Sequence, residues 1–174
     1  MPKGKTHDKI SFLLVLPTFL ATYFYTQDLN LSALVTIFML FGGLMFGPDL
    51  DINSKQYQRW GPLKFLWLPY QKIFSHRSPF THGIFLGTLV RISYFLLVIT
   101  LVTVITSYSW LIFHSKTPDL EGLIVQTTSQ ILTLANTLPK YYLVGMLIGV
   151  WLGAASHTIA DLLTTAFKQI VKSL

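Results

Sequence analysis

Four short stretches of the sequence carry side chains that can bind divalent metal ions. They are His7-Asp8, Pro48–Asp51, His76–Gly83 and His157–Asp161, and they contain four of the five histidines and four of the seven acidic residues. The rest of the chain is poor in charge, since 52% of all residues are hydrophobic and 11% are charged. Neutral imidazole and carboxylate are the ligands that suit zinc, iron or manganese. The concentration of these groups therefore predicts a metal site.

The predicted ligands are more numerous than a single catalytic ion requires. A catalytic zinc takes about three protein ligands and a water. Two ions, or one ion whose ligands are held by further polar groups, would use the larger supply. Zinc is the expected metal, with manganese or iron as alternatives, and the chain has no cysteine to offer a thiolate. The predicted ligands are His7, Asp49, Asp51, His76, His82, His157 and Asp161.

Two further residues are the predicted catalytic groups. Arg77 offers a forked donor beside His76 that can hold an anionic oxygen or, alternatively, form a salt bridge to one of the predicted aspartate ligands. Asp8 is expected to support the ligands from just outside the coordination sphere of the metal. The fifth histidine, His114, stands apart from the four stretches, and we interpret it as a membrane-interface residue without chemistry.

The spacing of the last stretch predicts a helix. His157 and Asp161 are four residues apart, so both project from one helix face. Upstream, Gly145, Gly149 and Gly153 continue the same spacing. Such small residues allow close packing against a neighbouring helix, which would carry His157 to the interior end of a helix bundle.

The composition predicts an integral membrane protein folded as one all-α metal-binding domain over residues 1–174. Its charged content is less than half of the ~25% usual in soluble domains. Four apolar runs are about long enough to cross a bilayer, and shorter interfacial helices are expected between them. The expected architecture is thus a bundle of about four transmembrane helices. The runs are Ile10–Tyr25, Leu31–Gly47, Gly83–Trp110 and Tyr141–Ala160.

The basic residues predict the orientation of these helices. With both termini inside, the inner segments carry ten Lys and Arg residues and the outer loops carry two, which is a strong inside bias. The same orientation puts all four ligand-bearing stretches on the cytoplasmic side. The net charge of +6 is then explained by basic residues that flank the membrane helices, and no nucleic-acid partner is expected. The expected partners are membrane lipids and, as an option, another membrane protein, while the oligomeric state is left open.

Other segments carry expectations of their own. Ile52–Ser75 mixes basic and aromatic residues, which is typical of a segment in the headgroup layer or, alternatively, of a loop packed on the bundle. Leu120–Leu138 is moderately apolar and is interpreted as a surface or re-entrant helix, because a fifth span would separate the ligand stretches. Pro17 is expected to kink the first helix. Arg91 is expected to reach the near surface or an acidic partner.

At the four stretches the chain resembles the bacterial membrane-bound metal-dependent hydrolases, and more closely a cyanobacterial branch of metal-binding membrane proteins. The resemblance implies a four-helix bundle, a divalent-metal site, and a bacterial inner-membrane or thylakoid location with the site facing the cytoplasm. Many hydrolase relatives have a histidine directly after the second aspartate, where this chain has Ile52, and this departure bears on hydrolysis more than on metal binding. The matching pieces follow in the same order over nearly the whole chain, and they are Gly4–Asp8, Gly47–Asp51, His76–Gly83 and Leu152–Leu162.

Two functions from different classes fit these observations. The first is a metal-dependent hydrolase acting on a phosphoester, a lipid among the options, at the cytoplasmic membrane face. A remote similarity to zinc-dependent phospholipases C implies the same chemistry. The second is a non-catalytic membrane protein whose metal ties helix ends together, and which serves as a subunit or assembly partner. The sequence leaves open whether the protein is an enzyme.

Overall fold

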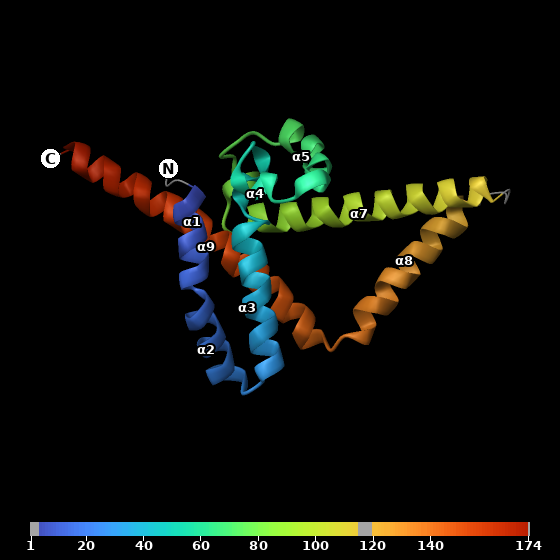
Figure 1. Ribbon diagram of the computed structural model, residues 1–174, viewed down its shortest axis with the longest axis horizontal. Helices are drawn as coiled ribbons and strands as arrows, with labels where there is room; N and C mark the ends of the chain where they lie inside the picture. The colour runs from blue at the N-terminus through green and yellow to red at the C-terminus, as the bar shows by residue number, and fades with distance from the viewer. Residues whose placement is uncertain (1–3, 115–119, 174) are drawn as a thin grey trace. The chain divides into compact units, whose positions relative to one another are not determined.

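The computed structural model is built from helices and describes residues 4–114 and 120–173 (Figure 1). No β-strand occurs within these two ranges, so the all-α prediction is confirmed. The chain divides into two compact units. The first contains the residues up to Arg91 together with those from Val144 onward, and the second is Ile92–Leu143. The single domain stays a prediction.

Four helical stretches are long and apolar enough to cross a membrane, and they correspond to the four predicted runs. α8 (Leu120–Thr137) is not among them, in line with the expected even count. Length and composition therefore agree with the membrane prediction, while the bundle arrangement and the orientation stay predictions. The four stretches are Gly4–Thr26, Leu29–Asp51, Leu86–Phe113 and Lys140–Lys172.

The first of these stretches is interrupted near its middle. α1 (Gly4–Leu13) and α2 (Val15–Thr26) are separated at Leu14. Pro17 has no amide hydrogen to donate to the Leu13 carbonyl, and its ring crowds that carbonyl. The interruption therefore lies about one turn before the proline, which accounts for the predicted kink.

A tight turn folds α2 back onto α3 (Leu29–Leu44). Gln27 adopts a left-handed conformation with a φ of 53°. Asp28 then caps α3, because its side chain accepts a hydrogen bond from the Leu31 amide at 2.9 Å. The returning chain leaves α1 in contact with α3, where Ser11 lies against Gly43. This contact holds the N-terminal residues of α1 near the end of α3.

α9 (Lys140–Ser173) packs on α3 through the predicted glycine ridge. Gly145 faces the start of α3, Gly149 its middle and Gly153 its end, so the two helices run in the same direction. A methyl group on Gly153 would overlap the Met39 carbonyl oxygen, which shows how closely the backbones approach. Small residues at such crossings are typical of membrane helices. The closest approach, at Gly153, lies about one turn of α9 before His157.

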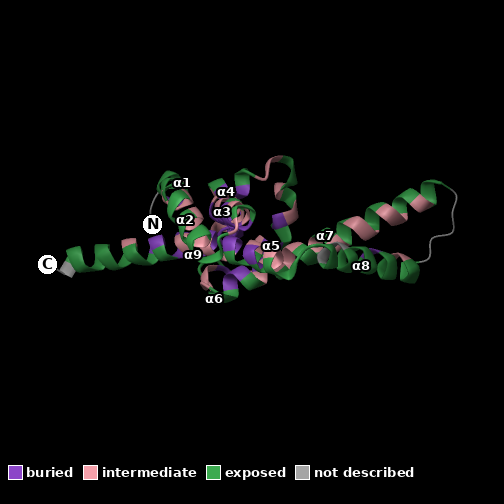
Figure 2. Ribbon diagram, turned by 90° about the horizontal axis from the view of Figure 1, so that it is seen from below, coloured by how far each residue is buried: buried purple, intermediate pink, exposed green. Residues whose placement is uncertain are grey.

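Short helices cover the end of α3. Trp67 and Tyr70 are fully buried under this cover, as the packed-loop alternative expects. Other large apolar side chains of this segment are exposed, so the headgroup-layer interpretation stays a prediction. Figure 2 shows the division of the ribbon into buried and exposed parts. The exposed residues include Leu63, Phe65, Leu68 and Ile73. The short helices are η1 (Pro48–Asp51), α4 (Lys55–Gln58), η2 (Gly61–Trp67), α5 (Leu68–Ile73) and α6 (Pro79–His82).

The second unit contains most of α7 (Leu86–Phe113) and all of α8. A hollow of about 420 Å³ lies between residues 106–111 of α7 and residues 123–130 of α8. None of the predicted ligands lines it. His114 follows α7, and its ring packs on Trp110 of the same helix at a centroid distance of 4.1 Å. We assign no chemistry to this unit.

Candidate metal centre

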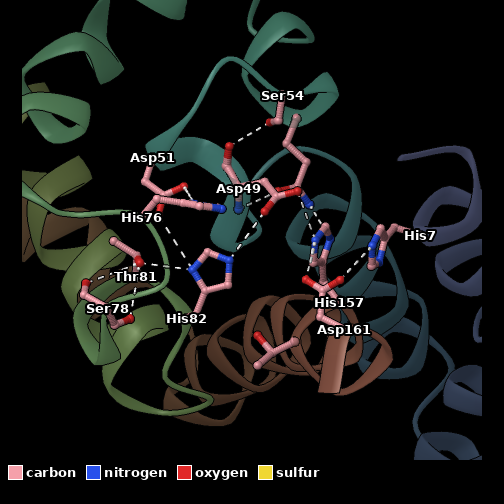
Figure 3. A network of polar contacts seen from close by, with 12 residues as sticks. His7, Asp49, Asp51, Ser54, His76, Ser78, Thr81, His82, His157 and Asp161 are labelled. Carbon is pink, nitrogen blue, oxygen red and sulfur yellow. Dashed lines mark hydrogen bonds and ion pairs between the residues drawn. The ribbon is translucent and has the colours of Figure 1, made fainter. Parts of the chain in front are cut away.

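The structure brings all seven predicted ligands together at one end of the first unit (Figure 3). His7 comes from α1, the two aspartates after Pro48 come from η1, and the last two ligands come from α9. His76 precedes α6 and His82 ends it. Their ligand atoms form three overlapping groups, in each of which the atoms lie within 4.8 Å of one another. The groups are His7–His157–Asp161, Asp51–His76–His82 and Asp49–His82–Asp161.

The first group joins α1 to α9. Each carboxylate oxygen of Asp161 lies near one imidazole. His7 Nε2 is 3.5 Å from Oδ1, and His157 Nε2 is 3.6 Å from Oδ2. The rings of His7 and His157 are stacked, with centroids 3.6 Å apart and planes 5° from parallel. The i, i+4 spacing on α9 and the packing of α1 on α3 together produce this arrangement.

The second group joins η1 to the α6 region. His76 Nδ1 lies 2.9 Å from Asp51 Oδ1, and His82 Nδ1 lies 3.7 Å from Asp51 Oδ2. The two imidazole rings meet edge to face at 4.9 Å. Pro79 begins the four-residue helix α6 and so turns the chain between the two histidines.

Asp49 lies between the two groups in Figure 3 and contacts both. Its Oδ1 is 3.5 Å from His82 Nε2, and its Oδ2 is 3.2 Å from His157 Nε2. A carboxylate with one oxygen toward a histidine of each group could bridge two cations. The arrangement therefore fits the predicted metal site, in which Asp49 would contribute to one ion or to two.

Unpaired polar atoms at the centre of the cluster fit a divalent cation. Several buried side-chain atoms have no hydrogen-bond partner within the described part of the chain. A buried polar atom left unpaired costs roughly 1–3 kcal/mol, and carboxylates this close also repel each other. A bound cation relieves both effects. The atoms are Nδ1 of His7, Oδ1 of Asp49, Oδ2 of Asp51, Nε2 of His82, Nε2 of His157 and both carboxylate oxygens of Asp161.

The buried amide of Gln56 connects three parts of the site. Its Nε2 donates to the Gly43 carbonyl at 2.7 Å and lies 3.2 Å from His157 Nδ1. Its Oε1 accepts a hydrogen bond from the Asp49 amide at 3.2 Å. Sequence reasoning missed this residue, because it lies in a segment whose basic and aromatic residues direct attention elsewhere. Nothing in its spacing links it to a histidine far along the chain.

Thr81 and Arg91 support His82 from the other side. The Thr81 hydroxyl lies 3.0 Å from His82 Nδ1, and the Thr81 carbonyl accepts a hydrogen bond from Arg91. Arg91 also donates to the Thr88 hydroxyl at 3.2 Å and is almost completely buried. It does not reach the surface, so that expectation was wrong. It forms no ion pair with a described residue, although the charges of Asp51 and Asp49 attract it. The start of α7 packs on α6 and turns the guanidinium inward.

The two predicted catalytic residues lie at the edge of the cluster. Asp8 belongs to none of the three ligand groups, and its Oδ2 instead pairs with Arg59 at 2.7 Å and with Lys55 at 3.5 Å. Arg77 has a left-handed backbone with a φ of 62°. It forms no ion pair with the described residues, so the salt-bridge alternative does not occur in this structure. Its side chain lines a hollow beside His82.

Two hollows reach the cluster from different directions. One has a volume of about 420 Å³ and is bounded by His82, Asp161 and Arg77 together with mainly apolar walls. The other is smaller, about 190 Å³, and is lined by His7, Asp49 and other polar side chains. The hollows therefore adjoin residues of the cluster, several of whose ligand atoms are themselves buried.

Comparisons with known proteins agree with a metal site. A family model described as "Uncharacterized metal-binding protein (DUF2227)" matches residues 2–171. An "Uncharacterized protein" of Aquifex aeolicus (strain VF5) is 50% identical to the chain over 56 residues, which cover 32% of the chain and 39% of that protein. The similar region thus spans less than half of that relative's length. No solved structure matches the chain.

Proposed function

We propose, because the chain belongs to the uncharacterized metal-binding protein family (DUF2227), that its cluster holds two divalent ions and hydrolyses a phosphoester at a membrane surface. The observation that carries this proposal is the position of Asp49, which contacts a histidine of each group while the larger hollow reaches the cluster at His82 and Asp161. Metal binding is the property of the family. Hydrolysis, the membrane location and the identity of the metal are parts of the proposal.

The seven ligands divide naturally between two ions. His7, His157 and Asp161 would hold one, Asp51, His76 and His82 the other, and Asp49 would be shared. Imidazole with carboxylate favours zinc, with manganese as the alternative. Ions bound there supply Lewis acidity, which activates water as a nucleophile and polarises a phosphoryl oxygen.

Arg77 and the charge of the site suit an anionic ester. Two divalent ions and the buried Arg91 outweigh the negative charge of the three aspartate ligands, so the loaded site attracts an anion. Arg77 is available to hold a non-bridging phosphate oxygen as charge builds on it. Asp8 acts by position, because its ion pairs with Arg59 and Lys55 tie α1 to α4 and so hold His7 in place.

The proposed reaction consumes only water. The oxygen of water forms a bond to phosphorus, and the bond between phosphorus and the ester oxygen breaks. One proton of the water is transferred to the departing oxygen, which leaves as an alcohol. No Ser or Cys nucleophile is required, because the ligand groups of His and Asp would hold the ions that activate the water.

A structural metal site is the alternative, since the same ligands tie α1, η1, α6 and α9 together. A structural site is closed, whereas a catalytic one keeps an open position. The hollow that reaches His82 and Asp161 favours the catalytic assignment.

The test is phosphate release from a panel of lipid and soluble phosphoesters by purified, metal-loaded protein. Asp49→Asn should abolish the activity. Arg77→Ala should lower the rate while metal content, measured by elemental analysis, is unchanged. If Asp49→Asn leaves the rate as in the wild type, the activity belongs to a contaminant. Bound metal without any hydrolysis would support the structural role.

A further inference from the structure

We infer that the larger hollow beside the cluster binds the hydrocarbon part of its substrate, so that the phosphoester is an amphiphile and not a small soluble ester. This inference rests on the proposed function and names the substrate class of that site. The hollow has a volume of about 420 Å³, within the range of roughly 300–1,000 Å³ usual for small-molecule sites.

The two ends of this hollow differ in chemistry. At one end lie His82 and Asp161, which together with Asp49 form one of the three ligand groups. The remaining wall is largely apolar, with Ile84 before α7 and Leu162 on α9. A molecule that fills the hollow would therefore place an anionic group at the ligands and a hydrocarbon group along the apolar wall.

Arg77 extends the polar end of the hollow. It is exposed, lines the hollow and has no ion-pair partner among the described residues. A guanidinium beside metal ligands is suited to a phosphate group. The polar end thus matches a phosphate, and the largely apolar remainder favours a hydrocarbon group as the group attached to it.

The surroundings of the hollow are also apolar. Leu162, which lines the hollow, is 59% exposed. Phe85, beside Ile84, is 72% exposed. An entrance with such a rim suits a ligand that arrives from a hydrocarbon medium and not from water.

Two other hollows of this unit do not have this combination. The one of about 190 Å³ is lined by polar and charged groups, including Asp8 and Lys55, and fits water or an ion. A second apolar hollow of about 420 Å³ lies between α1 and α9, but none of the seven ligands lines it. It offers a control surface of the same size.

Two adjacent threonines of α9 make a matched test. Thr165 lines the proposed substrate hollow, and Thr164 lines the apolar control hollow. Each hydroxyl donates to the carbonyl four residues earlier at 2.8 Å, so the two residues have the same role within the helix. Thr165→Trp should fill the substrate hollow, whereas Thr164→Trp should not.

The experiment measures binding of non-hydrolysable alkyl phosphonates, from methyl to dodecyl, to metal-loaded protein by titration calorimetry. Each buried methylene should tighten binding roughly fourfold until the hollow is full. Thr165→Trp, or the smaller Thr165→Phe if the first variant is unstable, should remove this chain-length dependence. Both should leave metal content and methylphosphonate binding unchanged, and Thr164→Trp should behave as the wild type.

A second measurement locates the alkyl chain of the bound phosphonate. The indole of Trp151 donates to the Ile84 carbonyl at 3.1 Å, so it lies beside the hollow wall. A brominated dodecyl phosphonate should quench tryptophan fluorescence in the wild type and much less in Trp151→Phe. Trp110→Phe, which alters the second unit, should not reduce the quenching.

Different failures have different meanings. A dissociation constant that does not change with chain length, or an equal loss in Thr164→Trp and Thr165→Trp, overturns the hydrocarbon site alone when metal and hydrolysis of a short ester are present. Protein that binds no metal overturns the proposed function and this inference together. Metal with phosphonate binding but no hydrolysis of any ester overturns the reaction and keeps the amphiphile site.

Discussion

Asp49 Oδ2 lies 3.2 Å from His157 Nε2, although one residue follows the end of α3 and the other lies in the middle of α9. The contact joins the N-terminal helices to the last helix at a single carboxylate. Because the other oxygen of that carboxylate faces His82, Asp49 is the residue on which the two ligand groups depend most.

Replacing Asp49 should therefore affect both metal positions. We expect Asp49→Asn to lower the metal content from two ions per chain to one or none, because an amide is a poor bridging ligand. Elemental analysis of the purified protein gives the ratio. Asp28→Asn is the matched control, since asparagine also caps a helix well and Asp28 is remote from the ligands in the chain. Two ions in Asp49→Asn would refute the shared carboxylate.

The amide of Gln56 should determine which ring nitrogen of His157 carries the proton. Its Nε2 donates to Nδ1 of that ring, which leaves the proton of the neutral imidazole on Nε2, the atom that faces the cluster. Metal binding at Nε2 must displace this proton. A carboxylate at position 56 would instead accept from an Nδ1–H, as in the usual carboxylate–histidine–metal arrangement.

We therefore expect Gln56→Glu to tighten metal binding roughly tenfold, the lower end of the effect of such outer partners. It should also reduce proton release on binding, measured by calorimetry in buffers of different ionisation enthalpy. Gln58→Glu adds the same charge at an exposed position of the same short helix and should have little effect. Equal proton release from both variants would contradict the assigned tautomer.

The glycines of α9 should differ in their tolerance of a methyl group. A methyl on Gly153 would meet the backbone of Met39 and Gly43, which cannot move without separating the helices. We expect Gly153→Ala to cost about 1–3 kcal/mol and to lower metal content. Gly145→Ala meets the flexible end of Leu31, at 2.7 Å, and should cost less. Thermal denaturation in detergent would rank them, and equal melting temperatures would refute the tight crossing.

The orientation in the membrane should follow the basic residues. A reporter fused at the C-terminus should be cytoplasmic, and one inserted after Leu138, between α8 and α9, should be on the opposite side. Fluorescent and phosphatase reporters give complementary signals at the two positions. Finding both on one side would refute the topology.

Residue type and helical spacing were sufficient to predict a set of His and Asp residues that the structure brings together. His157 and Asp161 share a helix face by register alone, and the proline turns after α3 and before α6 indicated where the chain bends toward them. Long-range packing was not accessible in the same way. The amide of Gln56 reaches His157 only because α3 and α9 cross at Gly153, and that contact depends on the whole first unit.

Arg91 is a second case in which the sequence does not show the long-range contacts of a residue. A lone arginine in an apolar run indicates a charge that must reach water or a partner. In the structure it donates hydrogen bonds to the carbonyl of Thr81 and the hydroxyl of Thr88, and no sequence pattern singles out these two groups. The break at Leu14 was easier to expect, because Pro17 acts on its own helix.

The ligands are distributed along the chain from His7 to Asp161, and this has a consequence for biosynthesis. When the ribosome has made the chain from α1 to η1, only His7, Asp49 and Asp51 of the seven predicted ligands exist, and none of the three ligand groups is complete. The first helices can pair at that stage, but the full set of predicted ligands is present only after α9 has been made and has docked. Under the proposed function, metal binding would therefore be the last step of maturation, and a chain truncated before Asp161 would lack a member of two of the three ligand groups.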